Sequence, residues 1–342
     1  MSTNINPQAT AVTILTGFLG AGKTTYLNHL LQRNSDIRYA IIENEYGEQS
    51  IDSDLIIRAE DGIVELNNGC LCCTLNDNLY DILNTLFDRR DEYDEIIIEA
   101  TGVADPTGLA EPFVIHPAVK KQFPLSGIIC LVDAELIFDQ LEQTKEAISQ
   151  IAYSDVLLVN KIDLVSEVHL KDVTSHLKKL NPLAQLAFGQ KDDFPDFDTI
   201  HQSALFDAVR AKSKVGGQDV FPVSKPHHHH HHHHTEEVVS HTVVFEQPFD
   251  GAMLRHRLFA YMAFQSQGLY RMKGLLYLDG SDEQHLLQSV GKRFDISEKR
   301  PWEAGEKRQS TIVFIGKNIG REGLEKMLSQ CLSKKTVNKN EA

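Results

Sequence analysis

The feature that most constrains the fold of this chain is a glycine-rich loop between an apolar run and a helical pattern. Residues 17–24, GFLGAGKT, fit the pattern G-x-x-x-x-G-K-[ST]. The run AVTILT at 11–16 precedes the loop, and apolar residues at helical spacing follow it. A strand, such a loop and a helix bind phosphate, because backbone N–H groups and the helix N-terminus face the anion. We therefore predict that nucleotide is bound by Gly17, Gly20, Ala21, Gly22, Lys23, Thr24 and Thr25.

Further apolar runs predict a mostly parallel sheet. They are continuous rather than alternating, which is typical of strands buried on both faces. Helical patterns at 76–90 and 135–152 separate some of them. The predicted fold class is α/β, a P-loop NTPase with a mostly parallel sheet flanked by helices. The runs that predict its further strands are 38–43, 95–99, 127–133 and 155–160.

A second, smaller α+β domain is expected after a histidine-rich linker. Beyond the linker, runs such as 238–247 and 269–280 alternate like strands with one solvated face, and 250–266 has a helical pattern. A further strand at 311–318 and a helix at 321–332 complete this domain. The predicted boundaries are 1–215 for the P-loop domain, 216–236 for the linker, 237–335 for the second domain and 336–342 for a frayed tail.

Two more segments stand where a P-loop hydrolase needs them. Glu99 ends the run 95–99 and can bind Mg²⁺ through water, and the Gly102 N–H can contact a γ-phosphate. Lys23 can reach the β- and γ-phosphates, and the Thr24 hydroxyl can bind Mg²⁺. The predicted catalytic residues are Lys23, Thr24, Glu99 and Gly102.

A base-recognition motif follows the run 155–160. Asn160-Lys161-Ile162-Asp163 fits N-K-x-D, in which Asp163 can accept hydrogen bonds from guanine N1–H and its 2-amino group. Adenine lacks this pair of donors, so a carboxylate here rejects ATP. We predict that Asn160 braces the loop, that the stem of Lys161 lies over the base, and that the nucleotide is GTP with Mg²⁺.

Three of the five cysteines, Cys70, Cys72 and Cys73, lie within four residues. Thiolates suit Zn²⁺ or Cu⁺, and a closed structural zinc site needs four protein ligands. Three thiolates leave a position for a carboxylate, a water or a recipient's ligand, as in a site that exchanges its metal. A thiol redox site and small buried apolar side chains are the alternatives. Such a cluster is expected in a reducing compartment, and we predict a cytoplasmic protein.

The position of the cysteines suggests how nucleotide and metal are coupled. They lie between the phosphate loop and the Glu99 run, where switch segments order around a γ-phosphate and relax on hydrolysis. Upstream, residues 43–48 carry three carboxylates and form a candidate first switch. Asp52 lies just beyond and is a candidate Mg²⁺ ligand.

These motifs together resemble the CobW-type GTPase metallochaperones, and most closely their YjiA-like branch. The matching segments are GFLGAGKTT, ENEYGEQSID, NNGCLCC, EATGVADP, NKID, RMKGLLYLDG and RPWEAGEKRQSTIVFIG. The resemblance implies a SIMIBI-type GTPase domain, a C-terminal CobW domain and a metal site at the cysteines. It also implies Glu43 as a ligand beside Cys72 and Cys73. The metal implied most often is zinc, with cobalt or nickel as variants.

An unbroken histidine tract lies between Pro226 and Thr235. Neutral imidazoles bind Zn²⁺, Ni²⁺, Cu²⁺ and Co²⁺ without strong selectivity. We expect weak capture of metal without a fixed geometry, and a passive linker or an engineered tag are the alternatives. The tract comprises His227, His228, His229, His230, His231, His232, His233 and His234.

Charge and composition narrow the partners. Residues 1–215 hold 17 Lys and Arg against 33 Asp and Glu, which argues against nucleic acid and anionic membranes as partners. No apolar run approaches the ~20 residues of a membrane span. Basic residues of the second domain could dock an acidic partner, and a homo-oligomer stays open. These basic residues are Arg255, Arg257, Arg271 and Lys273.

The sequence thus favours a GTP-hydrolysing chaperone that loads a metal, most simply Zn²⁺, and delivers it to a client metalloprotein. A non-catalytic zinc buffer that stores metal on its thiolates and histidines is the alternative. A small-molecule kinase is a third hypothesis, against which the N-K-x-D loop and the cysteine cluster both argue.

Overall fold

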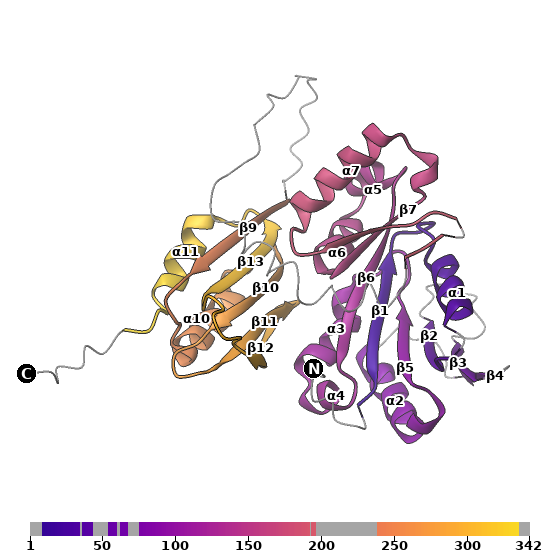
Figure 1. Cartoon of the computed structure of the whole chain (residues 1–342), viewed down its shortest axis with the longest axis horizontal. Coiled ribbons are helices and arrows are strands. Elements are labelled where there is room, and N and C mark those ends of the chain that lie inside the picture. Colours follow the sequence, from indigo (N-terminus) through magenta and orange to yellow (C-terminus); the bar gives the residue numbers. More distant parts are fainter. Residues whose placement is uncertain are drawn as a thin grey trace, which may run out of the picture.

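The computed structural model describes residues 9–34, 36–43, 54–59, 62–67, 75–191, 193–195 and 238–334. For Glu43 and for residues 54–59, 62–67 and 75–78 it describes the backbone only. The described chain forms two sheets, each with its own helices, and they lie side by side (Figure 1). The predicted α/β architecture with a smaller α+β domain is confirmed.

The first sheet has eight strands in the order β4-β3-β2-β5-β1-β6-β7-β8. The six strands from β2 to β8 run parallel, and the hairpin β3–β4 adds antiparallel to β2. The carboxyl ends of the parallel strands therefore meet at one edge. The strands are β1 (Ala11–Gly17), β2 (Tyr39–Glu43), β3 (Asp54–Ala59), β4 (Gly62–Asn67), β5 (Glu95–Glu99), β6 (Leu125–Asp133), β7 (Val156–Asn160) and β8 (Gln185–Phe188).

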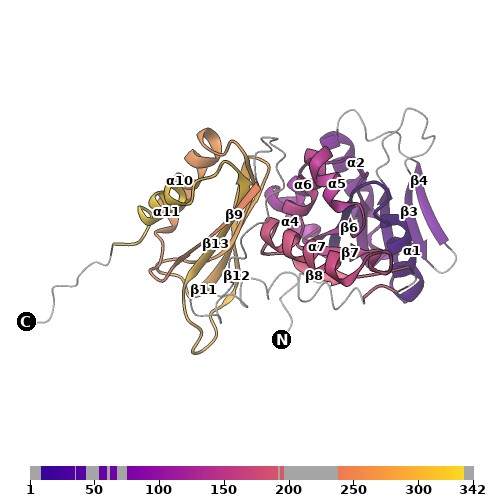
Figure 2. The ribbon, with the colours of Figure 1, turned by 90° about the horizontal axis from the view of Figure 1, so that it is seen from above.

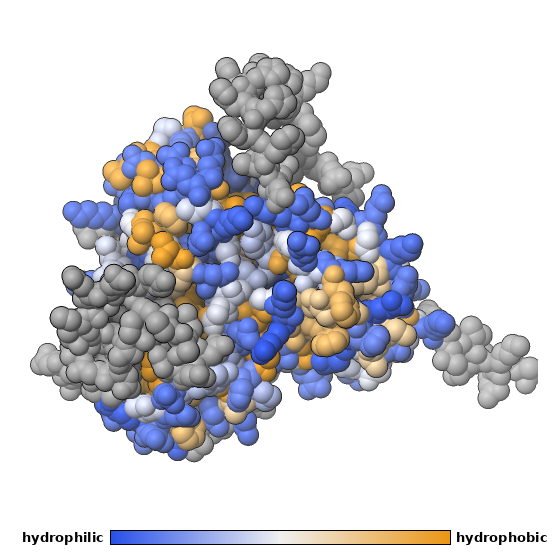
Figure 3. Space-filling view, turned by 180° about the vertical axis from the view of Figure 1, so that it is seen from behind, coloured by the Kyte–Doolittle hydropathy of each residue, from blue (hydrophilic) through white to orange (hydrophobic). Residues whose placement is uncertain are grey.

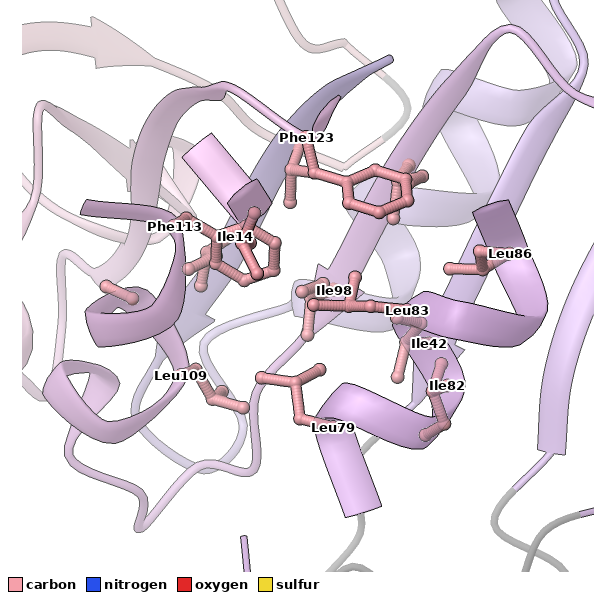
Figure 4. Packing of buried hydrophobic residues seen from close by; sticks show 14 of the residues in the cluster. Ile14, Ile42, Leu79, Ile82, Leu83, Leu86, Ile98, Leu109, Phe113 and Phe123 are labelled. Atoms are coloured by element: carbon pink, nitrogen blue, oxygen red, sulfur yellow. The ribbon is translucent and has the colours of Figure 1, made fainter. Parts of the chain in front are cut away.

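Helices cover both faces of this sheet. On one face, Leu79 and Leu83 of α2 and Phe113 of α3 pack against Ile14 and Ile98 (Figure 4). On the other face, α1 packs against the sheet with apolar side chains one turn apart. Continuous apolar strands are stable here because both of their faces are covered. The helices are α1 (Lys23–Arg33), α2 (Leu75–Asp88), α3 (Pro106–Ile115), α4 (Pro117–Gln122), α5 (Ile137–Gln143), α6 (Lys145–Tyr153) and α7 (Glu167–Leu180).

The second sheet has five antiparallel strands in the order β12-β11-β10-β13-β9. Helices α10 and α11 cover one of its faces with a core that includes Leu258, Phe314 and Leu328. The strands are β9 (Val238–Phe245), β10 (Leu269–Tyr277), β11 (Glu283–Val290), β12 (Arg293–Pro301) and β13 (Ser310–Lys317), and the helices are α10 (Gly251–Phe264) and α11 (Arg321–Ser329).

The prediction of one solvated face for the second sheet is wrong, because that face packs against the first domain (Figure 2). Val313 and Ile315 of β13 join an apolar cluster with Ala152 and Leu183 of the first domain. Strand β10 is accordingly buried on both faces over most of its length. The contacts run from α3 to β11 and β12, from α6 to β10 and from α7 to β9.

The expected acidic partner of two basic residues lies within the chain. Arg271 and Lys273 are buried at the domain seam and both pair with Asp155, the residue before β7, so they are not free to dock another protein. Lys120–Asp295 and Arg293–Glu111 ion pairs join the domains nearer the surface. Arg255 and Arg257 remain exposed on α10.

One helix prediction is also wrong. The expected helix at 135–152 is two helices, α5 and α6, because Thr144 adopts an extended backbone conformation and caps α6 by accepting a hydrogen bond from Ala147 N. The predicted linker and tail, 216–236 and 336–342, lie outside the described residues, and the domain boundaries stay predictions.

No helix within the described ranges is long and apolar enough to cross a bilayer. The face of the molecule seen in Figure 3 is mostly hydrophilic, with smaller hydrophobic areas between.

Candidate nucleotide and metal site

The glycine-rich loop connects β1 to α1 at the carboxyl edge of the sheet. Gly17, Gly20 and Gly22 have φ angles of 138°, 76° and 99°, which favour glycine. A Cβ atom at Gly17 would lie 2.3 Å from the Leu131 carbonyl oxygen, so the loop also needs glycine for its close approach to β6. A loop of left-handed glycines at a helix N-terminus forms the kind of cradle that suits a phosphate chain.

Lys23 and Thr24 begin α1 within this cradle. Lys23 Nζ donates to the carbonyl oxygens of Gly17 at 2.9 Å and Phe18 at 3.4 Å. Burial lowers the pKa of Lys23, an effect that the nearby Glu99 carboxylate opposes. The Thr24 hydroxyl donates to Glu99 Oε1 at 3.1 Å, which joins the two residues predicted to hold Mg²⁺. Hydroxyl and carboxylate oxygens are hard ligands that fit this ion.

The loop after β5 lies against the glycine-rich loop. Gly102 is buried, and a Cβ atom on it would lie 2.7 Å from the Leu19 backbone nitrogen. Thr101 Oγ1 and Asn160 Oδ1, both buried near this edge, have no hydrogen-bond partner among the described residues. Buried polar atoms without partners are costly, and at this edge they are positions where a nucleotide can supply the missing contacts.

The N-K-x-D segment lies at the end of β7. Asn160 Nδ2 donates to the Ala21 carbonyl oxygen at 2.9 Å, which ties this segment to the glycine-rich loop. Lys161 has a left-handed backbone, with φ of 61°, and its Nζ lies 2.6 Å from Asp133 Oδ2. Asp163 is exposed in a short 3₁₀ helix, Ile162–Leu164, so its carboxylate is accessible to a base.

Sequence reasoning missed Asp133, which has no motif of its own. It ends β6, is fully buried, and accepts hydrogen bonds from the backbone N–H groups of Glu135 and Leu136. Its ion pair orients the Lys161 side chain. The two residues are 28 positions apart in the sequence and meet because β6 and β7 are neighbouring strands. An acidic residue at the end of an apolar strand next to the N-K-x-D strand was the available signal.

The predicted metal ligands lie mostly outside the described residues. Cys70, Cys72, Cys73, Asp52 and the histidines 227–234 belong to this group, and the side chain of Glu43 is not described. Within the described ranges, no group of three or more His, Cys, Asp or Glu side chains could hold a metal ion. The chemistry of the cysteine cluster therefore stays a prediction.

The strands that flank these ligands do reach the nucleotide edge. Strand β2 pairs parallel with β5, and its last residue, Glu43, is in register with Glu99. Strand β4 runs parallel to β2 and ends at Asn67, three residues before Cys70, while α2 begins at Leu75. The chain enters the cysteine segment from the edge at which Glu99 lies.

Comparisons with known protein families agree with this architecture. Residues 11–188 match the nucleotide-binding domain of the CobW/HypB/UreG family, and residues 238–332 match the cobalamin synthesis protein cobW C-terminal domain. The zinc chaperone YjiA of Escherichia coli K12 is 33% identical over 316 residues, which cover 91% of this chain and 95% of that protein. The zinc-regulated GTPase metalloprotein activator 1 of Schizosaccharomyces pombe is 30% identical and covers 91% of this chain, which spans 83% of that protein.

Solved structures give the same result. The crystal structure of Zn(II)-bound YjiA GTPase from E. coli superposes with a TM-score of 0.67 at 30% identity, over 95% of this chain and 99% of that one. A Zn(II)-bound triple mutant of that GTPase, with one glutamate and two cysteines replaced by alanine, matches with the same TM-score and coverage. The chain therefore belongs to the CobW/HypB/UreG family and joins its nucleotide-binding domain to a CobW C-terminal domain.

Proposed function

We propose that the chain is a GTPase that binds Zn²⁺ through Cys70, Cys72, Cys73 and Glu43 and delivers it to a client protein. In this proposal the GTP-bound state holds the metal, and hydrolysis weakens the site. The relatives above are a zinc chaperone and GTPases, and the residues of this chain would supply the same chemistry.

The observation that carries the proposal is the register of Glu43 with Glu99 in neighbouring parallel strands. Adjacent strands lie ~4.8 Å apart. Strand β2, which carries the proposed zinc ligand Glu43, and β5, which carries the proposed Mg²⁺ ligand Glu99, therefore end beside each other. A γ-phosphate that repositions the Glu99 edge would act directly on the end of β2. The structure thus supports coupling between the two sites through one strand pair.

Hydrolysis of GTP would depend on positioning and charge neutralisation. Thr24 and Glu99 would hold Mg²⁺, which neutralises charge on the β- and γ-phosphates when bound. Lys23 would leave the Gly17 carbonyl oxygen and pair with the same phosphates, and the Gly102 N–H would contact the γ-phosphate. Asp163 would select guanine, with Lys161 held over the base by Asp133.

The cysteines would serve as the transfer site. Three thiolates and one carboxylate give Zn²⁺ a four-coordinate site whose carboxylate is the weakest ligand, so a client ligand can replace it. The histidine tract 227–234 would collect metal and pass it on, and Asp52 would supply a further carboxylate for Mg²⁺.

Two measurements test the proposal. Phosphate release from GTP should exceed that from ATP at least tenfold and should be lost in Lys23→Ala. Zn²⁺ affinity, measured by competition with a chelating dye, should be higher with a non-hydrolysable GTP analogue than with GDP. Equal Zn²⁺ affinity in both nucleotide states contradicts the transfer cycle and favours the zinc buffer.

Matched variants locate the metal site. Cys72→Ala and Glu43→Gln should remove the nucleotide dependence of Zn²⁺ affinity. Cys331→Ala is the control, because Cys331 is a buried thiol of the second domain that donates to backbone carbonyl oxygens. Loss of Zn²⁺ binding in the control as well would contradict the assignment.

A further inference from the structure

Helix α6 carries a buried glutamine that the motifs do not explain. Gln150 is 1% exposed, and its Nε2 donates to the carbonyl oxygens of Gly102 and Ala104, each at 3.1 Å. Both amide hydrogens of the Gln150 side chain therefore form hydrogen bonds with the loop that follows Glu99. A buried amide with two backbone partners holds a loop more firmly than a side chain that water can reach.

The same loop also contacts the glycine-rich loop and β1. Gly102 lies so close to Leu19 of the glycine-rich loop that a Cβ atom would not fit between them. Ala100 N donates to the Leu15 carbonyl oxygen at 2.8 Å, which attaches the start of the loop to β1. Gly102 is thus held between the glycine-rich loop and Gln150, and these contacts fix the residue whose N–H is predicted to meet the γ-phosphate.

The second domain holds the end of the helix that carries Gln150. Arg271 of β10 donates through Nη1 to the carbonyl oxygens of Tyr153 and Ser154, the latter at 2.8 Å, and through Nη2 to Asp155 at 2.6 Å. A cation at these last carbonyl groups also suits the helix dipole. The Ser154 hydroxyl donates to the Gln150 carbonyl oxygen at 2.6 Å, so a continuous set of contacts joins Arg271 to Gly102.

We propose that Gln150 is a positioning residue for GTP hydrolysis, and that the second domain sets its position through Arg271. The inference rests on the proposed function, because it concerns the γ-phosphate contact of Gly102. A small displacement of a catalytic contact is costly, with ~1 Å able to reduce a rate about 100-fold. GDP has no γ-phosphate, so its binding does not depend on this contact.

The decisive variant is Gln150→Met, which keeps the length of the side chain and removes both N–H donors. The kcat for GTP should fall at least tenfold, and the affinity for a non-hydrolysable GTP analogue should fall while that for GDP stays unchanged. Gln140→Met is the control, because Gln140 is a buried glutamine on the neighbouring helix α5 and should leave kcat unchanged.

Arg271→Lys tests the connection without disturbing the surroundings of Gln150. Lysine can keep the ion pair with Asp155, but it cannot also reach the carbonyl oxygens of Tyr153 and Ser154. The kcat should fall several-fold, and the double variant with Gln150→Met should lose no more than Gln150→Met alone, because both act through one contact.

Three results would overturn the inference. The first is a wild-type kcat in Gln150→Met, and the second is an equal loss of GTP-analogue and GDP affinity, which indicates general damage to the fold. The third is additive losses in the double variant, which would remove the role of Arg271. A wild-type protein that releases no phosphate from GTP overturns the proposed function itself, so the two failures are distinguishable.

Discussion

Arg271 and Asp155 form an ion pair of 2.6 Å across the domain seam, with both side chains 6% exposed. Lys273 pairs with the same carboxylate at 2.5 Å. Burial alone would raise the pKa of Asp155, but the charges of Arg271 and Lys273 and their hydrogen bonds hold it well below its ordinary value. One carboxylate therefore pairs with two buried basic side chains.

The first prediction concerns the stability of this seam. Asp155→Asn leaves two buried cations without a counter-charge and should lower the free energy of unfolding by about 3–5 kcal/mol. Asp295→Asn is the matched control, since the Lys120–Asp295 pair also joins the domains but is partly exposed, and it should cost at most about 1 kcal/mol. Urea denaturation followed by the fluorescence of Trp302, the single tryptophan, measures both. Equal losses would contradict the prediction.

The second prediction concerns stability in alkali. Burial, and then the charges of Lys273 and Arg300, lower the pKa of Lys299 from 10.5 to about 8. Between these values the unfolded chain binds one more proton than the folded chain, so the contribution of Lys299 to stability rises with pH. The stability of the wild type relative to Lys299→Met should rise between pH 8 and pH 10, by at most about 1.4 kcal/mol per pH unit.

Urea denaturation at several pH values between 7 and 10 measures this difference. The exposed Lys292, in the turn between β11 and β12, provides the control variant Lys292→Met, whose stability relative to the wild type should not change with pH. A difference for Lys299→Met that is flat over this range would contradict the prediction.

The third prediction concerns base selection. In the proposed site the Asp163 carboxylate would accept hydrogen bonds from two guanine donors. An asparagine amide offers one acceptor and one donor, which suits xanthine with its carbonyl oxygen in place of the 2-amino group. In Asp163→Asn the kcat/KM for GTP should fall about 100-fold, and XTP should become the better substrate. Phosphate release from both nucleotides decides this, with the exposed Asp172→Asn on α7 as the control.

The fourth prediction compares two glycines of the phosphate loop. Gly20→Ala and Gly22→Ala both place a side chain on a left-handed backbone. A Cβ atom at Gly20 meets nothing within 4 Å, but one at Gly22 would lie 2.4 Å from Asn160 Nδ2 and displace it from the Ala21 carbonyl oxygen. Gly22→Ala should therefore be less stable than Gly20→Ala by about 1–3 kcal/mol in nucleotide-free protein, and identical denaturation midpoints would contradict this.

Local patterns were sufficient for the phosphate loop and for several strands of the first domain. The run 95–99 coincides with β5, and the glycine-rich loop lies between β1 and α1 as expected. Both signals can be read from neighbouring residues alone. A continuous apolar run indicates a strand buried on both faces, and a glycine-rich turn indicates a left-handed backbone. The hairpin β3–β4 was missed, although its segments DLIIRA and GIVELN each contain at least three apolar residues.

Patterns failed where burial depends on distant segments. Strand β11 buries Gln284, His285 and Ser289, so it lacks the apolar alternation that sequence reasoning requires. Arg271 and Lys273 were interpreted as surface cations, because nothing near them in the sequence shows that Asp155 would cover them. Charged residues usually lie on the surface, but tertiary contacts bury both of these side chains.

The candidate site divides in the same way. The phosphate and guanine motifs could be predicted because their chemistry requires fixed residue types at fixed spacing. Asp133 and Gln150 belong to no such motif, since each contacts a partner 28 or more residues away through a single side chain. The metal ligands Cys70, Cys72 and Cys73 stay predictions from sequence.

The shared seam has a practical consequence for dissecting this protein. Cutting the chain after β8 would strip Ala152 and Leu183 of their apolar cover and leave Asp155 facing water without either cation. The isolated first domain would expose this apolar surface to solvent, and α6 would lose the hydrogen bonds that Arg271 donates to its carboxyl end. If Arg271 sets the position of Gln150 as proposed, the kcat of such a fragment would be lower than that of the whole chain. Kinetic work on truncated versions therefore needs the intact polypeptide as its reference.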